Sequence, residues 1–335
     1  MIYLILFFLL ASLLLYTILG GADFGAGILE LFTRKRDTQK VRNLTYKAIG
    51  PVWEANHIWL ILIVVILFVA FPEVYRLLSV HLHIPIMLML LGIILRGAAF
   101  IFRHYDAIKD GSQKTYSRVF ISASFLTSLF LGITAGATIL GRIDPEIIDF
   151  YGAYIGPWFN AFSIALGIFF TAVCAFLAAV FLVGETDDPA LKRMFYRQTV
   201  GSNIVAVISG IGVFVAAGLQ GLALHEMYLE STMTIASVIL ATFIVPLLWR
   251  TLNQGHYQWA RLLAGAEVAL ILFGWLWVQF PAMIRLANDT VTYQAAQAPD
   301  AVLNVMGWVL IGGALLIFPS LYYLFRVFKF EQAAS

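Results

Sequence analysis

The chain has 335 residues, of which 61% are hydrophobic and only 12% are charged, and its formal net charge is +2. Soluble domains carry about 25% charged residues, so this composition excludes a large soluble core and indicates an integral membrane protein. Its single cysteine, Cys174, excludes an intrachain disulfide and any thiolate-based zinc or iron–sulfur site. The first apolar stretch runs on without a small-residue cleavage site, so we expect it to be a retained helix.

Long apolar segments recur along the whole chain. Crossing the hydrocarbon layer of about 30 Å takes about 20 helical residues, and nine segments reach that length. The seventh is short and carries Pro246. The predicted fold is therefore an all-α polytopic membrane protein, a single integral membrane domain over residues 1–335, with two four-helix bundles plus one peripheral helix. The predicted spans are 2–32, 52–71, 81–103, 117–140, 158–184, 200–222, 231–249, 257–281 and 301–327.

Basic residues gather in alternate connections between these spans. Because such residues mark the cytoplasmic side, the pattern predicts an outside N-terminus and a cytoplasmic C-terminus. Residues 34–48 form either a surface helix, with Val41, Leu44 and Ala48 on its apolar face, or a solvated basic loop. The basic residues of the inner side are Arg34, Lys35, Arg36, Lys40, Arg42, Lys47, Arg103, Lys109, Lys114, Arg118, Lys192, Arg193, Arg197, Arg250, Arg261, Arg326 and Lys329.

Two polar insertions interrupt the first two spans. The first helix carries the run GGADFGAG at residues 20–27, which places the carboxylate of Asp23 among glycines. The second span opens with GPVWEANHIW at residues 50–59, so Glu54 and His57 enter the membrane together on one side of a helix. Polar groups at membrane depth cost free energy and commonly line a pathway or a protein contact.

Two further ionisable residues lie inside the predicted spans, Arg96 in the third and Glu267 in the eighth. In the structural interpretation, Arg96 pairs with Asp23 or with Glu54 and joins the first three helices. In the functional interpretation, Glu54, with Asp23 or His57 behind it, carries protons inward from the cytoplasm. The two interpretations are compatible. For Glu267 we expect a structural role, and a second proton-accessible acid is the alternative.

Small residues at a spacing of four predict close helix contacts. Gly21 and Gly25 in the first span, and Gly132 and Gly136 in the fourth, fit this pattern. Haem ligation in a membrane bundle needs histidine or methionine at depth, and only His57 among the histidines has that position. With no evident second ligand facing it, the sequence predicts no haem held by this chain alone and no metal site.

The motifs around these residues resemble a known family. Residues 23–27 (DFGAG), residues 51–59 (PVWEANHIW) and residues 303–308 (LNVMGW) are similar to subunit II of the cytochrome bd-type quinol oxidases. The resemblance covers essentially the whole chain and includes the nine spans, and it implies a multi-pass protein of a bacterial plasma (inner) membrane. It implies a haem-free subunit II that stabilises a haem-bearing subunit I and supports access of protons, and of oxygen, while O₂ is reduced to water.

The resemblance also implies the partners and cofactors of the complex. Subunit I is expected to hold two b-type haems and one d-type haem, or a b-type haem in its place, and to oxidise quinol. Small single-helix accessory subunits and a structural quinone occur in the family; no nucleic acid is expected. By motif position, Glu54 replaces an aspartate of the proton path, and Trp59, with Trp53 and Asn56 nearby in the motif, falls near a lateral oxygen access. His57 stands where some relatives have glutamine.

Two other functions are compatible with the same residues. A proton-coupled secondary transporter would use Asp23, Glu54 and Arg96 to bind substrate and proton near the midplane, but should show inverted repeats and paired broken helices. Neither is clear in this sequence. A quinone-binding anchor of another respiratory complex is the third hypothesis.

Overall fold

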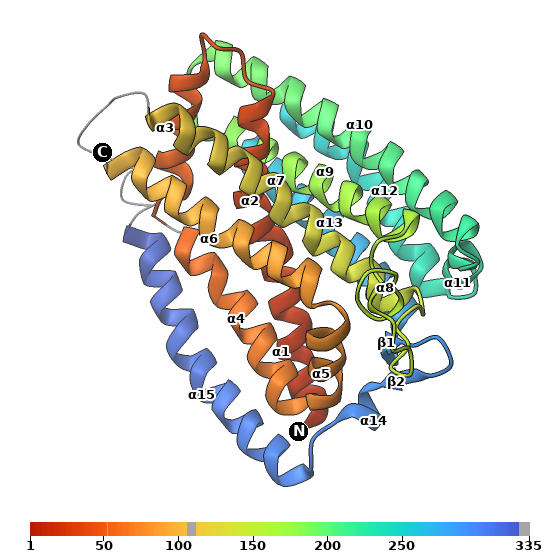
Figure 1. Ribbon diagram of the computed structural model, residues 1–335. Coiled ribbons are helices and arrows are strands. Elements are labelled where there is room, and N and C mark those ends of the chain that lie inside the picture. The colour runs from red at the N-terminus through yellow and green to blue at the C-terminus, as the bar shows by residue number, and fades with distance from the viewer. Residues whose placement is uncertain (52, 106–111, 328–335) are drawn as a thin grey trace.

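The computed structural model describes residues 1–51, 53–105 and 112–327. Within these ranges, nine helices are long and apolar enough to cross a membrane. The all-α prediction is confirmed, with one small two-stranded hairpin as an addition. The N-terminus lies at one end of the bundle, beside the start of the last helix (Figure 1).

The first half of the chain supplies four of the spans and two shorter helices. The first span is a composite helix, in which a π-helical turn separates two α-helices. In chain order the elements are α1 (Ile2–Leu15), η1 (Tyr16–Gly20), α2 (Gly21–Leu31), α3 (Thr38–Ile49), α4 (Trp53–Ala70), α5 (Pro72–His81), α6 (His83–Tyr105) and α7 (Ser112–Ile139).

The second half supplies the other five spans and all of the extended structure. In chain order the elements are α8 (Phe150–Tyr154), α9 (Ala161–Val183), α10 (Pro189–Leu219), α11 (Leu224–Leu229), α12 (Thr232–Asn253), α13 (Tyr257–Gln279), β1 (Ala282–Arg285), β2 (Thr290–Thr292), α14 (Tyr293–Ala296) and α15 (Asp300–Phe325). The strands β1 and β2 pair antiparallel.

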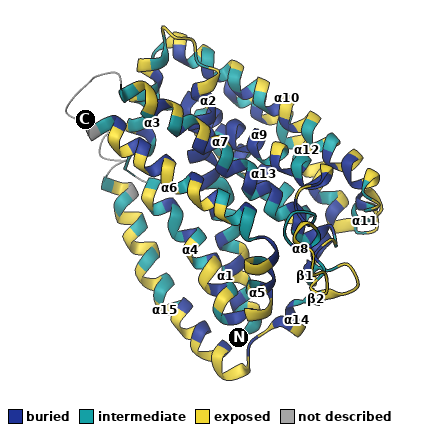
Figure 2. Ribbon diagram, in the orientation of Figure 1, coloured by how far each residue is buried: buried dark blue, intermediate teal, exposed yellow. Residues whose placement is uncertain are grey.

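The spans form two groups that share a central layer. The composite first helix, α4, α6 and α7 pack together, and α9, α10, α12 and α13 make the second group. Because α2 and α7 both pack on α9, the buried side chains concentrate where the groups meet (Figure 2). The last helix, α15, contacts α1 and α4 along the edge of the molecule (Figure 1). This is the predicted arrangement of two bundles with one peripheral helix.

Glycines allow the central helices to approach closely. A Cβ atom on Gly25 would overlap the Cys174 carbonyl oxygen on α9. A Cβ atom on Gly132 of α7 would lie 2.7 Å from the Gly167 Cα atom, which is also on α9. Both positions are closer than a side chain permits, so the predicted role of these small residues in helix packing is confirmed.

Several predicted boundaries are wrong, for identifiable reasons. The sixth span begins at Pro189 rather than at residue 200, because Asp188 caps the helix by accepting a hydrogen bond from the Ala190 N–H. Residues 189–199 form the first turns of this helix, ahead of its long apolar part. The seventh span continues through Pro246 to Asn253. Residues 38–49 form a helix with Val41 and Ala48 buried, which decides between the two interpretations of the basic segment.

Candidate functional site: a buried charge network beside an exposed glutamate

The composite first helix provides the deepest polar group of the chain. Its π-helical turn, Tyr16–Gly20, widens the backbone one turn before Asp23. Such turns insert a residue and are frequent at functional sites. Every residue from Gly21 to Glu30 is buried, because α2 lies between α7 and α9. The carboxylate of Asp23 is therefore enclosed by protein on all sides.

Arg96 of α6 is the cation that pairs with Asp23. The Arg96 Nη2 atom donates to the Asp23 carboxylate and also to the Asp23 carbonyl oxygen, at 3.1 Å for the latter. Its Nε atom donates to the Ser124 hydroxyl at 3.2 Å. The guanidinium carbon lies 5.1 Å from the Phe120 ring centroid. Both charged side chains are only 1% exposed, so the pair is fully withdrawn from solvent.

A second buried ion pair, which the sequence patterns did not predict, lies two helical turns away. The Arg103 Nη1 atom donates to both carboxylate oxygens of Glu30 at 2.9 Å, and Arg42 Nε lies 3.5 Å from the same carboxylate. Arg103, at the end of the third predicted span, belongs to α6 and is buried. The seven-residue spacing from Asp23 to Glu30, equal to that from Arg96 to Arg103, was the signal available in the sequence.

Glu54 stands apart from these pairs. It lies in the first turn of α4 and is exposed, and no ion pair among the described residues includes it. Of the two partners expected for Arg96, the structure therefore places Asp23 beside it and not Glu54. One turn further along α4, His57 is partly buried. The structure brings Asp23 and Arg96 into direct contact but leaves Glu54 on the surface of the chain.

His57 is enclosed mainly by aromatic rings. Its ring centroid lies 6.2 Å from those of Tyr16 and Phe24 and 6.4 Å from that of Trp53. Neither ring nitrogen has a hydrogen-bond partner among the described residues. The Tyr16 hydroxyl and the Asp23 Oδ2 atom are likewise buried without such a partner. The π-helical turn thus gathers an imidazole, a phenol and a carboxylate oxygen that have hydrogen-bonding capacity left.

The remaining residues of the α4 motif have packing contacts. Asn56 donates to the Leu19 carbonyl oxygen of the π-helical turn at 3.4 Å. Trp59 is 6% exposed, with its ring 6.1 Å from that of Phe318 on α15. Trp53 packs against Phe100 of α6. These contacts attach the start of α4 to the π-helical turn on one side and to α15 on another.

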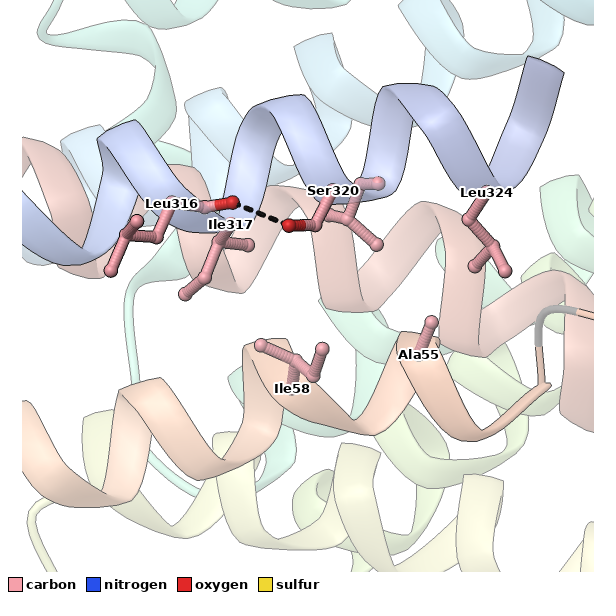
Figure 3. A pocket seen from close by; sticks show the side chains of 7 residues that line it. Ala55, Ile58, Leu316, Ile317, Ser320 and Leu324 are labelled. Atoms are coloured by element: carbon pink, nitrogen blue, oxygen red, sulfur yellow. Dashed lines mark hydrogen bonds between the residues drawn. The ribbon is translucent and has the colours of Figure 1, made fainter.

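An open apolar groove runs between α4 and α15 beside this motif. Ala55 and Ile58 line one wall, and Leu316, Ile317 and Leu324 belong to the other (Figure 3). The Ser320 hydroxyl in this groove donates to the Leu316 carbonyl oxygen of its own helix at 2.7 Å. The groove therefore offers almost only apolar groups to whatever occupies it.

The described residues contain no group of three or more His, Cys, Asp or Glu side chains that could hold a metal ion. A haem needs only one or two axial ligands, so a single histidine at membrane depth could hold one. His57 is that histidine, and the test is whether its neighbours include a second ligand. The aromatic rings of Tyr16, Phe24 and Trp53 lie 6.2–6.4 Å from that imidazole, and none of them supplies the second imidazole or thioether that is usual at a six-coordinate membrane haem.

A sequence model of the family described as cytochrome bd terminal oxidase subunit II matches residues 1–328. The chain belongs to this family. It is 26% identical over 340 residues to cytochrome bd ubiquinol oxidase subunit 2 of Bacillus subtilis (strain 168), covering 96% of this chain and 95% of that protein. It is 23% identical over 339 residues to cytochrome bd-I ubiquinol oxidase subunit 2 of Escherichia coli (strain K12), covering 91% and 89%.

A solved structure has the same fold. The bd oxidase from Geobacillus thermodenitrificans superimposes with a TM-score of 0.78 over 98% of this chain and 99% of that chain, at 18% sequence identity. The predicted resemblance is thus confirmed at the level of the family. Cytochrome bd oxidase subunit II is a multi-pass membrane component of a respiratory oxidoreductase, and the family implies a haem-containing complex and a subunit I partner.

Proposed function

We propose that this chain is the haem-free subunit II of a quinol:O₂ oxidoreductase, in which a separate subunit I holds the haems, two b-type and one d-type or b-type. The chain stabilises that subunit and gives protons from the cytoplasm access to it. Membership in the subunit II family supports the assignment, and the donor set around His57 supports the absence of haem from this chain. In this proposal residues 1–335 act as one membrane domain, with the N-terminus outside and the C-terminus in the cytoplasm.

One observation carries the proton proposal: Glu54 is exposed at the start of a membrane-spanning helix and has no cation beside it among the described residues. A carboxylate facing lipid is costly, so such a group is normally directed at a protein partner or at water. We therefore place the contact with subunit I at this part of α4. Glu54 receives protons there and passes them toward the haem-bearing partner.

The groups behind Glu54 have different parts in this route. His57 lies three residues along α4 on the same side, and its ring nitrogens are available for hydrogen bonding. Asp23 is bound by Arg96 through one oxygen, and its other oxygen is left as an acceptor. In our proposal His57 relays the proton and Asp23 supplies a fixed negative charge that favours its passage.

Oxygen access is the second part of the proposal. Dioxygen is apolar and dissolves in the hydrocarbon layer, and the groove between α4 and α15 is lined by aliphatic side chains next to Trp59. We propose that Trp53, Asn56 and Trp59 shape this access by fixing α4 against its neighbours. If a complex carrying Trp59→Ala keeps the wild-type apparent affinity for oxygen, the proposal on oxygen access is wrong.

Glu54→Gln tests the proton route. The variant keeps the size and polarity of the side chain but cannot accept a proton, so we expect oxygen reduction by the purified complex to slow by about 10²-fold, the lower end of what a positioned proton-transferring group contributes. The haem optical spectrum should remain that of the wild type. Glu73→Gln is the matched control, because Glu73 is an exposed glutamate on α5 that pairs with Arg76. Full turnover in Glu54→Gln would remove Glu54 from the route.

A further inference from the structure

The second helix group contains a buried acid that the proposed proton route does not use. Glu267 lies ten residues after Tyr257 at the start of α13, which places it about 15 Å along a helix of about 34 Å, close to the middle of the membrane. Glu267 is only 7% exposed. Asn203 of α10, which is 3% exposed, lies against it. The hydrophobic cluster to which Ala264 and Val268 of α13 belong also draws on α2, α3, α9, α10 and α12, and includes Phe176 and Phe195.

Glu267 has one side-chain hydrogen bond and no cation beside it within the described residues. The Asn203 amide donates to the Oε1 atom at 3.4 Å, and the Oε2 atom is buried without a hydrogen-bond partner among the described residues. None of the ion pairs within those residues includes Glu267. Arg261, six residues earlier on α13, pairs with Glu185. The other titratable side chains on the elements around α13 are Tyr16 on η1, Cys174 on α9, Lys192, Arg193, Tyr196 and Arg197 on α10, His225, Glu226 and Tyr228 on α11, and Arg250 on α12.

Glu30 gives an internal comparison within the same chain. It is a glutamate of almost equal burial, 5% exposed, but its carboxylate lies between Arg103 and Arg42. Two cations compensate for the loss of water around Glu30, whereas a single amide faces Glu267. An ionised carboxylate that is buried without a cation is strongly disfavoured, and the group takes up a proton instead.

We propose that Glu267 and Asn203 form a proton-binding site in the α9–α10–α12–α13 group, separate from the Glu54 route, and that Glu267 holds its proton at neutral pH in the resting complex. The ligand is the proton itself. Asn203 holds the carbonyl oxygen of the acid, and the hydroxyl is carried by the oxygen that has no acceptor within the described residues. The site does not depend on the proposed proton route, since the contacts of Glu267 and of His57 involve different residues.

Infrared spectroscopy of the purified complex, prepared with isotope-labelled glutamate, distinguishes the two protonation states directly. The difference between wild type and Glu267→Gln at about pH 7 should contain the C=O stretching band of a protonated carboxyl group. The difference between wild type and Glu30→Gln should contain carboxylate bands instead. Asn203→Val should move the Glu267 band to higher wavenumber, because it removes the hydrogen bond to the carbonyl oxygen. Carboxylate bands in the Glu267→Gln difference would overturn the proposal.

Thermal stability of the same complexes gives an independent measurement. Glutamine matches a neutral glutamic acid in shape and charge, so Glu267→Gln should unfold at the wild-type temperature and keep wild-type oxygen reduction. Glu30→Gln makes the same chemical change next to two arginines and should lower the unfolding temperature, because it removes their counter-charge. A loss of stability in Glu267→Gln as large as that in Glu30→Gln would show that Glu267, like Glu30, is an ionised member of a charged pair, and would overturn the assignment.

Discussion

The Asp23–Arg96 pair allows a direct test of how buried charge holds the first helices together. Arg96→Met removes the cation but keeps most of the side-chain volume, and leaves the Asp23 carboxylate buried without its ionic partner. Removing one member of a buried pair typically costs about 3–5 kcal/mol. The loss here should lie in the upper part of that range, because Arg96 also donates to Ser124 and lies over Phe120.

The assay is the thermal unfolding of the purified complex, compared with a matched arginine variant. Arg76→Met breaks an exposed pair with Glu73, whose side chains are 54% and 47% exposed, and exposed pairs contribute about 0–1 kcal/mol. Adding Asp23→Asn to Arg96→Met removes the uncompensated charge, so the double variant should recover part of the lost stability. If Arg96→Met and Arg76→Met unfold at the same temperature, the buried pair does not stabilise the helix group.

Two further predictions concern the helix contacts on α2 and the inner surface. Gly25→Ala should prevent stable assembly, because its Cβ atom would overlap the Cys174 carbonyl oxygen; recovery of wild-type amounts of complex from membranes would contradict this. Lys40 donates to Asp188 at 2.8 Å, and this hydrogen bond lowers the pKa of the Asp188 carboxyl. The Lys40–Asp188 pair therefore stabilises the fold at neutral pH, and this stabilisation is lost as the pH falls below the ordinary aspartate range. Asp188→Asn, which keeps the helix cap, should therefore be less stable than the wild type at neutral pH and equal to it at acid pH, as measured by thermal unfolding.

The spans were predictable because a bilayer requires long apolar helices whatever their packing. The errors occur where a helix leaves the lipid. Residues 189–199 include Lys192, Arg193 and Arg197 and so lie outside the long apolar run, although Pro189 behind the capping Asp188 marks a helix start. The hairpin of β1 and β2 had no alternating pattern long enough to recognise. Its strands have four and three residues.

The site was only partly predictable, and the reason is the same in each case. Sequence identifies a charge at membrane depth but not the helix that faces it, so Asp23 and Glu54 were equal candidates for Arg96. The pair of Glu30 and Arg103 was not predicted, because charges near the ends of spans are usually solvated. Their pairing depends on α2 lying between α7 and α9, an arrangement that no local pattern encodes.

The acids Asp23, Glu30, Glu54 and Glu267 differ in what surrounds them, and this decides which of them suits proton transfer. Asp23 and Glu30 are held by arginines, so protonating either would leave a buried cation without its counter-charge. Glu267 faces only an amide, so ionising it would leave a buried anion without a cation. Glu54 is exposed, and among the described residues it has no arginine partner. This is why the proposed route begins at Glu54.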